Sequence, residues 1–311
     1  MNLYDKLKEK EPFSLSCHHD ADGIYSATLL RRIFNVKEPI EIPKFNEYTT
    51  DVAVDLGFPK EKEWSGICID HHPDHPEEKG YTLYWDHCPT GLILYNHLKE
   101  HIKPSDYWLV VGSLCGDGQP ELVPDEIWDS VPTLLQGRGI LYKSSWKLGI
   151  SNNPLYVFLS SGINALSRLG YPNEALKVLN EIKNPVDLLE NAVIKDAIEK
   201  MRKEEDSIYA SKPIVESCGN FSIVRIKTSN PKIGICGLVG AKLMGIDNNM
   251  TYVVINEVNG DISIRGNLAK YLANKLSAVG IKAGGHAKYC GAHIEENEVD
   301  KFLDLLRGIK I

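Results

Sequence analysis

The chain has 311 residues, of which 43% are hydrophobic and 25% charged, the composition of a soluble globular protein with room for two domains. No apolar run approaches the roughly 18 residues of a membrane span, and the polar first residues lack the apolar core of a signal peptide, so we expect a cytoplasmic protein. Seven cysteines without a CxxC pair argue against a disulfide framework or a cysteine-ligated zinc site.

The net charge of −7 is unevenly distributed along the chain. Residues 1–199 carry 19 Lys and Arg against 30 Asp and Glu, a balance of −11, whereas residues 200–311 carry 16 against 12, a balance of +4. This division suits a metal-binding part followed by a phosphate-binding part. A protein that grips long nucleic acid through many phosphates has a stronger basic footprint than this.

Short apolar runs alternate with helical patterns over the first 120 residues. The runs lie at 13–17, 50–57, 65–70 and 108–117, and the helical patterns at 24–34 and 90–101. Such alternation predicts βα units around a mainly parallel sheet. The binding crevice of such a sheet lies at the carboxyl ends of its strands. Residues 132–168 are expected to be helical.

The pattern changes in the last third of the chain. Residues 188–211 predict a long charged helix, and after it come a strand at 221–228, a hairpin at 251–267 with Asn259-Gly260 as its two-residue turn, and a glycine-rich segment at 283–294. We therefore expect an α/β fold, with an N-terminal, mainly parallel sheet flanked by helices and a smaller α/β C-terminal domain. The expected bounds are 1–187 for the first domain, 188–211 for a helical linker and 212–311 for the second domain.

The segment "SCHHDADG" (16–23) contains His18, Asp20 and Asp22 in the spacing H-x-D-x-D-G. Alternate side chains at an extended strand end share a face, so these three can converge on one divalent cation. Gly23 permits the tight turn into the following helix. Alone, the motif is more simply an Asp-Gly loop with a helix-capping aspartate.

Three further polar groups follow apolar runs. Asp55 ends "VAVD", Asp70-His71-His72 follows "SGICI", and Asp117 ends "GSLCGD". Each is weak evidence by itself, because a strand-terminal aspartate often only caps a turn. Together they supply about six ligands, and two adjacent divalent ions need bridging carboxylates of this kind.

With these motifs in this order, the chain resembles the DHH phosphoesterases. The resemblance rests on "HHDADG", "VDLG", "DHH" and "GSLCGD". The later "GGHAKYCG" and "SIRGN" are similar to the glycine-histidine motif and the arginine segment of the DHH-associated domain in RecJ-type nucleases and bacterial nanoRNases. The likeness spans nearly the whole chain, although residues from about 122 to 211 carry no recognisable motif.

The resemblance implies two divalent cations, with Mn²⁺ the favoured ion and Mg²⁺ the alternative. The implied ligands are His18, Asp20, Asp22, Asp55, His71 and Asp117, with Asp55 bridging both ions. Oxygen and imidazole donors without thiolate agree with such ions. His19 follows His18 directly, so which of the two imidazoles binds metal stays open, although parity along the strand favours His18.

The resemblance also implies residues that act on the substrate. It assigns His72 to the phosphate and Asp70 to orienting a neighbouring imidazole. In the C-terminal part it implies phosphate binding by Arg265, by the backbone of Gly284 and Gly285, and by His286, and Asn267 is a weaker candidate.

The resulting hypothesis is a metal-dependent phosphodiesterase that cleaves single-stranded or short oligonucleotides, as a RecJ-like exonuclease or a nanoRNase. The alternatives are a nucleotide phosphatase acting on a small bisphosphorylated nucleoside, and a non-catalytic DHH scaffold, against which the full ligand set argues. The modest basic count favours short substrates. The sequence leaves open the cleavage polarity, the choice between DNA and RNA, the oligomeric state and the pathway.

Overall fold

The computed structural model describes residues 2–43, 47–59, 63–72, 75, 80–135, 140–143, 148–151, 154–285 and 287–309. The chain divides into two compact units: unit 1 comprises Met1–Tyr142, Leu148–Ser167 and Tyr171–Ile198, and unit 2 comprises Lys143–Lys147, Arg168–Gly170 and Glu199–Ile311. The linker bounds expected from the sequence stay a prediction. Within the described ranges, no helix is both long enough and apolar enough to cross a bilayer.

A four-stranded sheet forms the base of unit 1, in the order β1 (Leu15–Cys17), β2 (Val52–Val54), β3 (Ile67–Asp70) and β4 (Thr82–Trp85). All three pairings are parallel, which confirms the expected parallel sheet. Every residue of β1, β2 and β3 is buried, because parallel strands are covered on both faces. The edge strand β4 instead alternates between half-buried and exposed residues.

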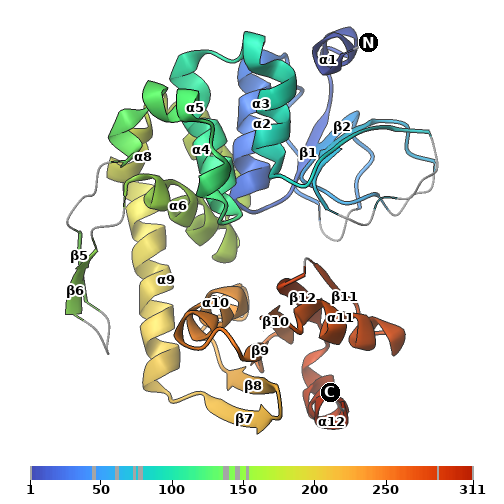
Figure 1. Cartoon of the computed structure of the whole chain (residues 1–311), viewed down its shortest axis with the longest axis vertical. Coiled ribbons are helices and arrows are strands. Elements are labelled where there is room, and N and C mark those ends of the chain that lie inside the picture. Colours follow the sequence, from blue (N-terminus) through green and yellow to red (C-terminus); the bar gives the residue numbers. More distant parts are fainter. Residues whose placement is uncertain are drawn as a thin grey trace. The chain divides into compact units, whose positions relative to one another are not determined.

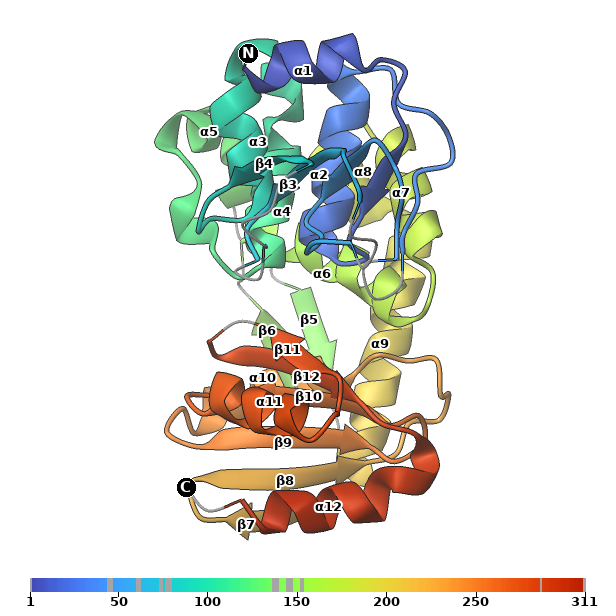
Figure 2. The same ribbon diagram turned by 90° about the vertical axis from the view of Figure 1, so that its right-hand side faces the viewer.

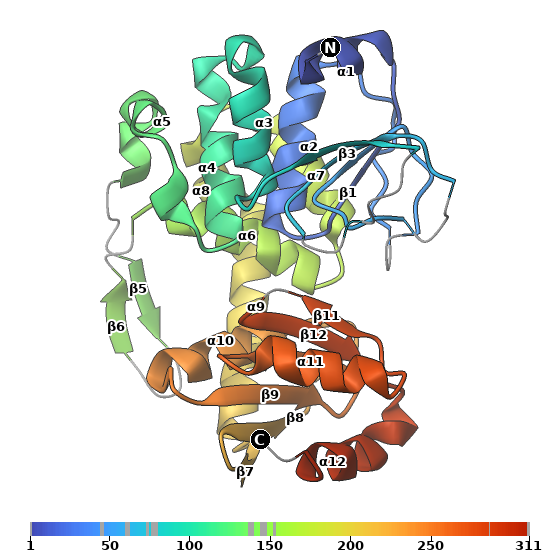
Figure 3. The ribbon, with the colours of Figure 1, turned by 45° about the vertical axis from the view of Figure 1, so that its right-hand side comes forward.

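Three helices pack side by side in unit 1: α2 (Ala21–Ile33), α3 (Thr90–Leu98) and α4 (Tyr107–Gly116) (Figure 1, Figure 3). Both α2 and α3 also contact the sheet. The close approach of α2 and α4 depends on Gly112, where a Cβ atom would lie 2.5 Å from the ring of the buried Tyr25. The other elements of unit 1 are α1 (Leu3–Glu9), α5 (Asp125–Ser130), β5 (Ile140–Lys143), β6 (Leu148–Ser151), α6 (Tyr156–Arg168), α7 (Pro172–Glu181) and α8 (Pro185–Glu190).

Three expectations about elements were wrong. The apolar run at 108–117 is helix α4, not a strand-like segment, and it is apolar all round because the helix is buried. The stretch 132–168 is not helical throughout, since the β5–β6 pair precedes α6. The helix expected at 188–211 is two helices, α8 and α9 (Ala192–Ala210), because the Asn191 side chain accepts hydrogen bonds from the first amides of α9.

Unit 2 contains a six-stranded sheet in the order β11-β12-β10-β9-β8-β7. Its elements are β7 (Ile214–Cys218), β8 (Phe221–Ile226), α10 (Cys236–Ile246), β9 (Thr251–Asn256), β10 (Asp261–Arg265), α11 (Ala269–Ala278), β11 (Ala283–Gly285), β12 (Tyr289–His293) and α12 (Val299–Arg307) (Figure 2). Only β8 and β9 pair in parallel.

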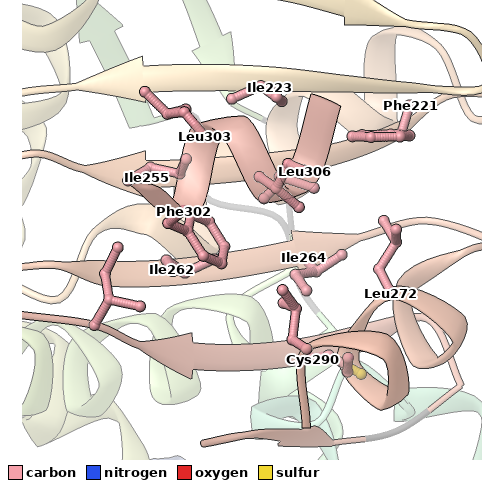
Figure 4. Close-up of a cluster of buried hydrophobic side chains, with 14 of the residues drawn as sticks. Phe221, Ile223, Ile255, Ile262, Ile264, Leu272, Cys290, Phe302, Leu303 and Leu306 are labelled. Carbon is pink, nitrogen blue, oxygen red and sulfur yellow. The ribbon is translucent and has the colours of Figure 1, made fainter. Parts of the chain in front are cut away.

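The core of unit 2 lies between this sheet and the helices α11 and α12. Phe302 and Leu306 of α12 and Leu272 of α11 contact strand residues such as Ile255 and Ile264 (Figure 4). The β9–β10 hairpin exists as expected, but its turn is longer than two residues. The Gly260 amide donates a hydrogen bond to the Asn256 carbonyl oxygen at 2.9 Å, so three residues lie between the two bonded residues. Of the two expected turn residues, only Gly260 has a positive φ, whereas a two-residue type I′ turn needs both.

Candidate metal centre

The loop after β1 brings His18 and Asp20 together. Asp20 caps α2, since its Oδ1 accepts a hydrogen bond from the Gly23 amide at 3.1 Å, and its Oδ2 lies 2.9 Å from His18 Nδ1. Gly23 lies within the helix rather than in a turn before it. A Cβ atom there would lie 2.5 Å from the His18 carbonyl oxygen, so the glycine allows the loop to lie directly on the first turn of the helix.

Asp22 does not join His18 and Asp20, contrary to the expectation of three alternating residues on a strand. The helix begins at Ala21, so Asp22 lies in its first turn and points elsewhere. Its fully buried carboxylate accepts hydrogen bonds from the Thr90 amide at 2.8 Å, at the start of α3, and from Ser113 Oγ of α4 at 2.5 Å. Three helices therefore fix this carboxylate in place.

Asp55 lies directly after β2 and is only 1% exposed. Its φ of 57° places it in the left-handed region, which is uncommon for a residue other than glycine and is typical of functional sites. Among the described residues, neither carboxylate oxygen has a hydrogen-bond donor. Oδ1 lies 3.2 Å from His71 Nε2, and Oδ2 lies 3.6 Å from His18 Nδ1, so the two oxygens face different histidines.

His71 follows β3 and is the centre of a second group. Its Nε2 lies 3.1 Å from Asp117 Oδ2, 3.2 Å from Asp55 Oδ1 and 3.8 Å from Asp22 Oδ2. Asp117 reaches this position from the end of α4. Asp22, Asp55 and Asp117 thus approach one imidazole from two helices and one strand end.

Asp70 contacts two other histidines. Its Oδ1 lies 2.7 Å from His72 Nδ1, and its Oδ2 lies 2.7 Å from His75 Nε2. Against the effect of burial, these two hydrogen bonds hold the pKa of Asp70 well below its usual range. An ionised carboxylate can only accept hydrogen bonds, so the protons lie on Nδ1 of His72 and on Nε2 of His75.

The other carboxylates of this site are buried and close together, so burial and mutual repulsion both oppose their ionisation. Burial raises the pKa of Asp55 well above its usual range, and the neighbouring Asp22, Asp20 and Asp117 raise it further. Burial, followed by the charges of Asp22 and Asp20, also raises the pKa of Asp117. Burial opposes protonation of His18, but the carboxylates around it, Asp20 foremost, raise its pKa to about 9. A bound cation would relieve this repulsion.

The donor atoms form groups in which all members lie within 4.8 Å of one another. One group contains His18, Asp20 and Asp55, and another contains Asp22, His71 and Asp117. Since Asp55 also lies beside His71, the six expected ligands form two neighbouring sets joined by Asp55. Exposed His19 belongs to neither set, which favours His18 as the ligand from this loop.

The expected phosphate-binding residues lie in unit 2. Arg265 packs its guanidinium against Gly237 of α10 and donates hydrogen bonds to the carbonyl oxygens of Ile264 and Cys290. Burial, followed by the charge of Arg168, lowers its pKa. Asn267 is exposed just beyond β10.

The glycine pair of unit 2 lies on edge strand β11. A Cβ atom at Gly284 would meet open space, whereas Gly285 has a φ of 133° and lies against the Tyr289 carbonyl. Lys270 of α11 donates a hydrogen bond to the Gly285 carbonyl. His286 lies outside the described residues.

Comparison with known proteins gives matches to solved structures only. No protein-family model and no curated protein matches the chain. RecJ from Thermus thermophilus, solved in complex with Mn²⁺, aligns with a TM-score of 0.70 at 16% identity, over 97% of this chain and 53% of that chain. This chain therefore spans about half the length of the RecJ chain.

Two further structures match over most of both chains. The pGpG-specific phosphodiesterase PggH from Vibrio cholerae aligns with a TM-score of 0.55 at 13% identity, over 95% of this chain and 97% of that chain. The DHH domain of a member of a family of ribosomal proteins aligns with a TM-score of 0.59 at 13% identity, over 98% of this chain and 88% of that chain. The chain has a DHH-family fold.

Some residues of this candidate site were not found from the sequence. His75 belongs to none of the motifs found in the sequence, yet its side chain is only 6% exposed and contacts Asp70. Ser113 gave no signal because a serine in an apolar run is common. Asn164 of α6 accepts a hydrogen bond from the Ala21 amide at 2.9 Å, which secures the start of α2, but it lies in a stretch without a recognisable motif.

Proposed function

We propose that this protein is a phosphoesterase that hydrolyses phosphodiester bonds in single-stranded or short oligonucleotides with the aid of two divalent cations. The observation that carries this proposal is the geometry of Asp55. Its two buried oxygens lack hydrogen-bond donors among the described residues and face different histidines, His71 and His18. A carboxylate in this situation is suited to bridge two cations.

The residues present fit such cations. We propose that His18, Asp20 and Asp55 hold one ion, and that Asp22, Asp55, His71 and Asp117 hold the other. Carboxylate and imidazole donors suit Mn²⁺, which we favour, and Mg²⁺. RecJ has been crystallised with each of these ions. When bound, the cations would lower the pKa of a water molecule to give a nucleophile and would neutralise charge on the phosphoryl oxygens.

His72 is the proposed contact to the reacting phosphate. Its side chain is 28% exposed, and its Nδ1–H is held by Asp70. With a proton also on the opposite nitrogen, Nε2, the imidazolium would donate a hydrogen bond to a phosphate oxygen. Asp70 fixes the tautomer and the ring orientation of His72, a role that buried carboxylates commonly have beside functional imidazoles.

In unit 2, we propose that Arg265 binds a substrate phosphate. Its guanidinium donates hydrogen bonds to two backbone carbonyl oxygens. Among the described residues, no carboxylate neutralises its charge. The backbone of Gly284 and Gly285 can approach an anion because neither residue has a side chain. We propose supporting roles for Asn267 and for His286.

The size of the substrate is inferred from charge. A balance of only +4 over residues 200–311 suits a short ligand with few phosphates better than a long strand. PggH is described as specific for pGpG, a dinucleotide, which agrees with a short substrate. A bisphosphorylated nucleoside is the second candidate, since it carries the same phosphate chemistry in a smaller molecule. We also propose a cytoplasmic location.

A substrate panel tests the function. Protein stripped of metal with a chelator is supplied with Mn²⁺ and then given a labelled dinucleotide, a single-stranded 20-mer and adenosine 3′,5′-bisphosphate. We expect turnover, fastest for the dinucleotide. Asp55→Asn should reduce kcat/KM by more than about 100-fold and lower the bound Mn²⁺, because it removes a shared ligand. Asp129→Asn, which removes an exposed carboxylate, is the matched control and should change neither. No turnover of any substrate together with no bound metal would favour a non-catalytic scaffold.

A further inference from the structure

A large aromatic side chain is exposed beside the candidate metal centre. Trp85 is the last residue of β4 and pairs in register with Asp70 at the end of β3. Its side chain is 39% exposed, although tryptophan is usually well covered in folded proteins. Parallel sheets bind ligands at this carboxyl edge of the strands. The exposure of Trp85 at this edge therefore indicates that its ring contacts a ligand in addition to its neighbours in the fold.

The indole ring is anchored to the segment that carries the proposed phosphate contact. Trp85 Nε1 donates a hydrogen bond to the backbone carbonyl of His72 at 2.8 Å. His87, also exposed, meets the indole edge-on, with 4.4 Å between ring centroids and 72° between ring planes. The hydrogen bond satisfies the polar edge of the ring, so the exposed part of Trp85 offers apolar π surface.

We propose that Trp85, oriented by His87, is a stacking platform for a nucleobase of the substrate. The proposal rests on the proposed function and narrows it, because a base-bearing phosphate ester has a flat π face to place on the ring whereas inorganic polyphosphate has none. Stacking of a base on an aromatic side chain tolerates any base, because every base has a π face. His72 would contact the phosphate while the anchored ring contacts the attached base.

Leu83 provides a matched control on the same strand. It lies two residues before Trp85, on the same face of β4, and is 37% exposed. Two residues span about 6.6 Å along a strand, which takes Leu83 away from the carboxyl edge. If exposed apolar surface alone mattered, Leu83→Ala would have the same effect as Trp85→Ala. If a π face beside His72 matters, only the tryptophan change will act.

The test compares a ligand that has a base with one that lacks it. Calorimetry measures binding of AMP and of ribose 5-phosphate to the Mn²⁺-loaded full chain for wild type, Trp85→Ala, Trp85→Phe and Leu83→Ala. We expect wild type to bind AMP about 10–100-fold more tightly than ribose 5-phosphate. This ratio should fall to near 1 in Trp85→Ala and persist in Leu83→Ala. It should persist largely in Trp85→Phe, which keeps a π face but loses the indole N–H.

An unchanged ratio in Trp85→Ala would overturn the platform. An equal loss of the ratio in Trp85→Phe would also overturn it, because the indole hydrogen bond to His72, and not the π face, would then be responsible. Circular dichroism and the Mn²⁺ content establish that each variant is folded and loaded. Turnover of the dinucleotide is measured on the same samples. Absent turnover in wild type with an intact AMP preference would count against the proposed hydrolysis and not against the platform.

Discussion

Asp70 holds the imidazole of His72, and Asp70 is itself held by His75, which lies outside the DHH tripeptide. His75 Nε2 and His72 Nδ1 each lie 2.7 Å from a different oxygen of Asp70, which is completely buried. A carboxylate with both oxygens engaged cannot rotate without breaking a hydrogen bond. We therefore propose that His75 acts on His72 through Asp70, as a positioning residue.

Removal of His75 should impair the chemistry more than the fold. We expect His75→Ala to lower kcat on the dinucleotide by about 10–100-fold, the usual effect of losing an outer partner of a functional imidazole. His75→Gln, whose amide can donate to Asp70 from a similar position, should recover part of kcat. His293→Ala removes a histidine from an exposed pair with Asp261 in unit 2 and should leave kcat unchanged. Equal loss in the Gln and Ala variants, or an unchanged kcat in both, would contradict this role.

The sequence predicted that these residues lie together better than it predicted the contacts that each one makes. The residues of "HHDADG" and "DHH" do lie together, because the two segments come at the carboxyl ends of β1 and β3, which flank β2 in the parallel sheet. The partition of the ligands was not predictable by parity, because α2 begins between Asp20 and Asp22 and turns the second carboxylate towards His71. No periodicity in the sequence predicts that His75 contacts Asp70.

Among the helices, the candidate metal centre depends on how closely α4 approaches α2. Asp22 belongs to α2, and Ser113 and Asp117 belong to α4 and its C-terminal end. A shift of α4 would therefore move Asp117 away from His71. Gly112, one residue before Ser113, sets this distance, because its missing side chain leaves room for the Tyr25 ring.

Gly112→Ala should destabilise the protein and weaken metal binding together. A Cβ atom 2.5 Å from Tyr25 Cζ forces the two helices apart, and overpacking of this kind costs about 1–3 kcal/mol of unfolding free energy. Gly245→Ala in α10 meets no atom within 4 Å and should be neutral or stabilising by up to about 1 kcal/mol, because alanine favours a helix. Urea unfolding and Mn²⁺ titration of both variants measure the two effects. A Gly112→Ala protein with unchanged stability would show that the helices move apart at no cost.

Helix α4 also shows a limit of predicting secondary structure from the sequence. A ten-residue apolar run fits a buried strand and a buried helix equally well, since neither leaves a polar face to reveal its period. The strands β1 to β3 were recognisable because polar residues follow each of them at a sheet edge. Asp117 follows α4 in the same manner, so the same signal brought a carboxylate to this site from a type of element that the sequence did not predict.

For the whole molecule, the proposed roles are divided between the two units. Every proposed metal ligand belongs to unit 1, whereas Arg265 and the glycine pair belong to unit 2. The charges follow the same division, with −11 over residues 1–199 and +4 over residues 200–311. Metal binding should therefore stabilise one unit far more than the other.

Hydrogen exchange can measure this difference. A ligand that binds only the folded state adds about 2.7 kcal/mol of stability at a concentration 100 times its Kd, which slows exchange through unfolding by about 100-fold. With Mn²⁺ at that concentration, we expect slower exchange in peptides that cover β1, β2, β3 and the first turn of α2, and little change in β7 to β10. Asp55→Asn should abolish the protection, whereas Asp129→Asn should retain it. Equal protection in both units would show that the ions are held by residues of unit 2 as well, and unchanged exchange throughout would contradict the metal centre proposed around Asp55.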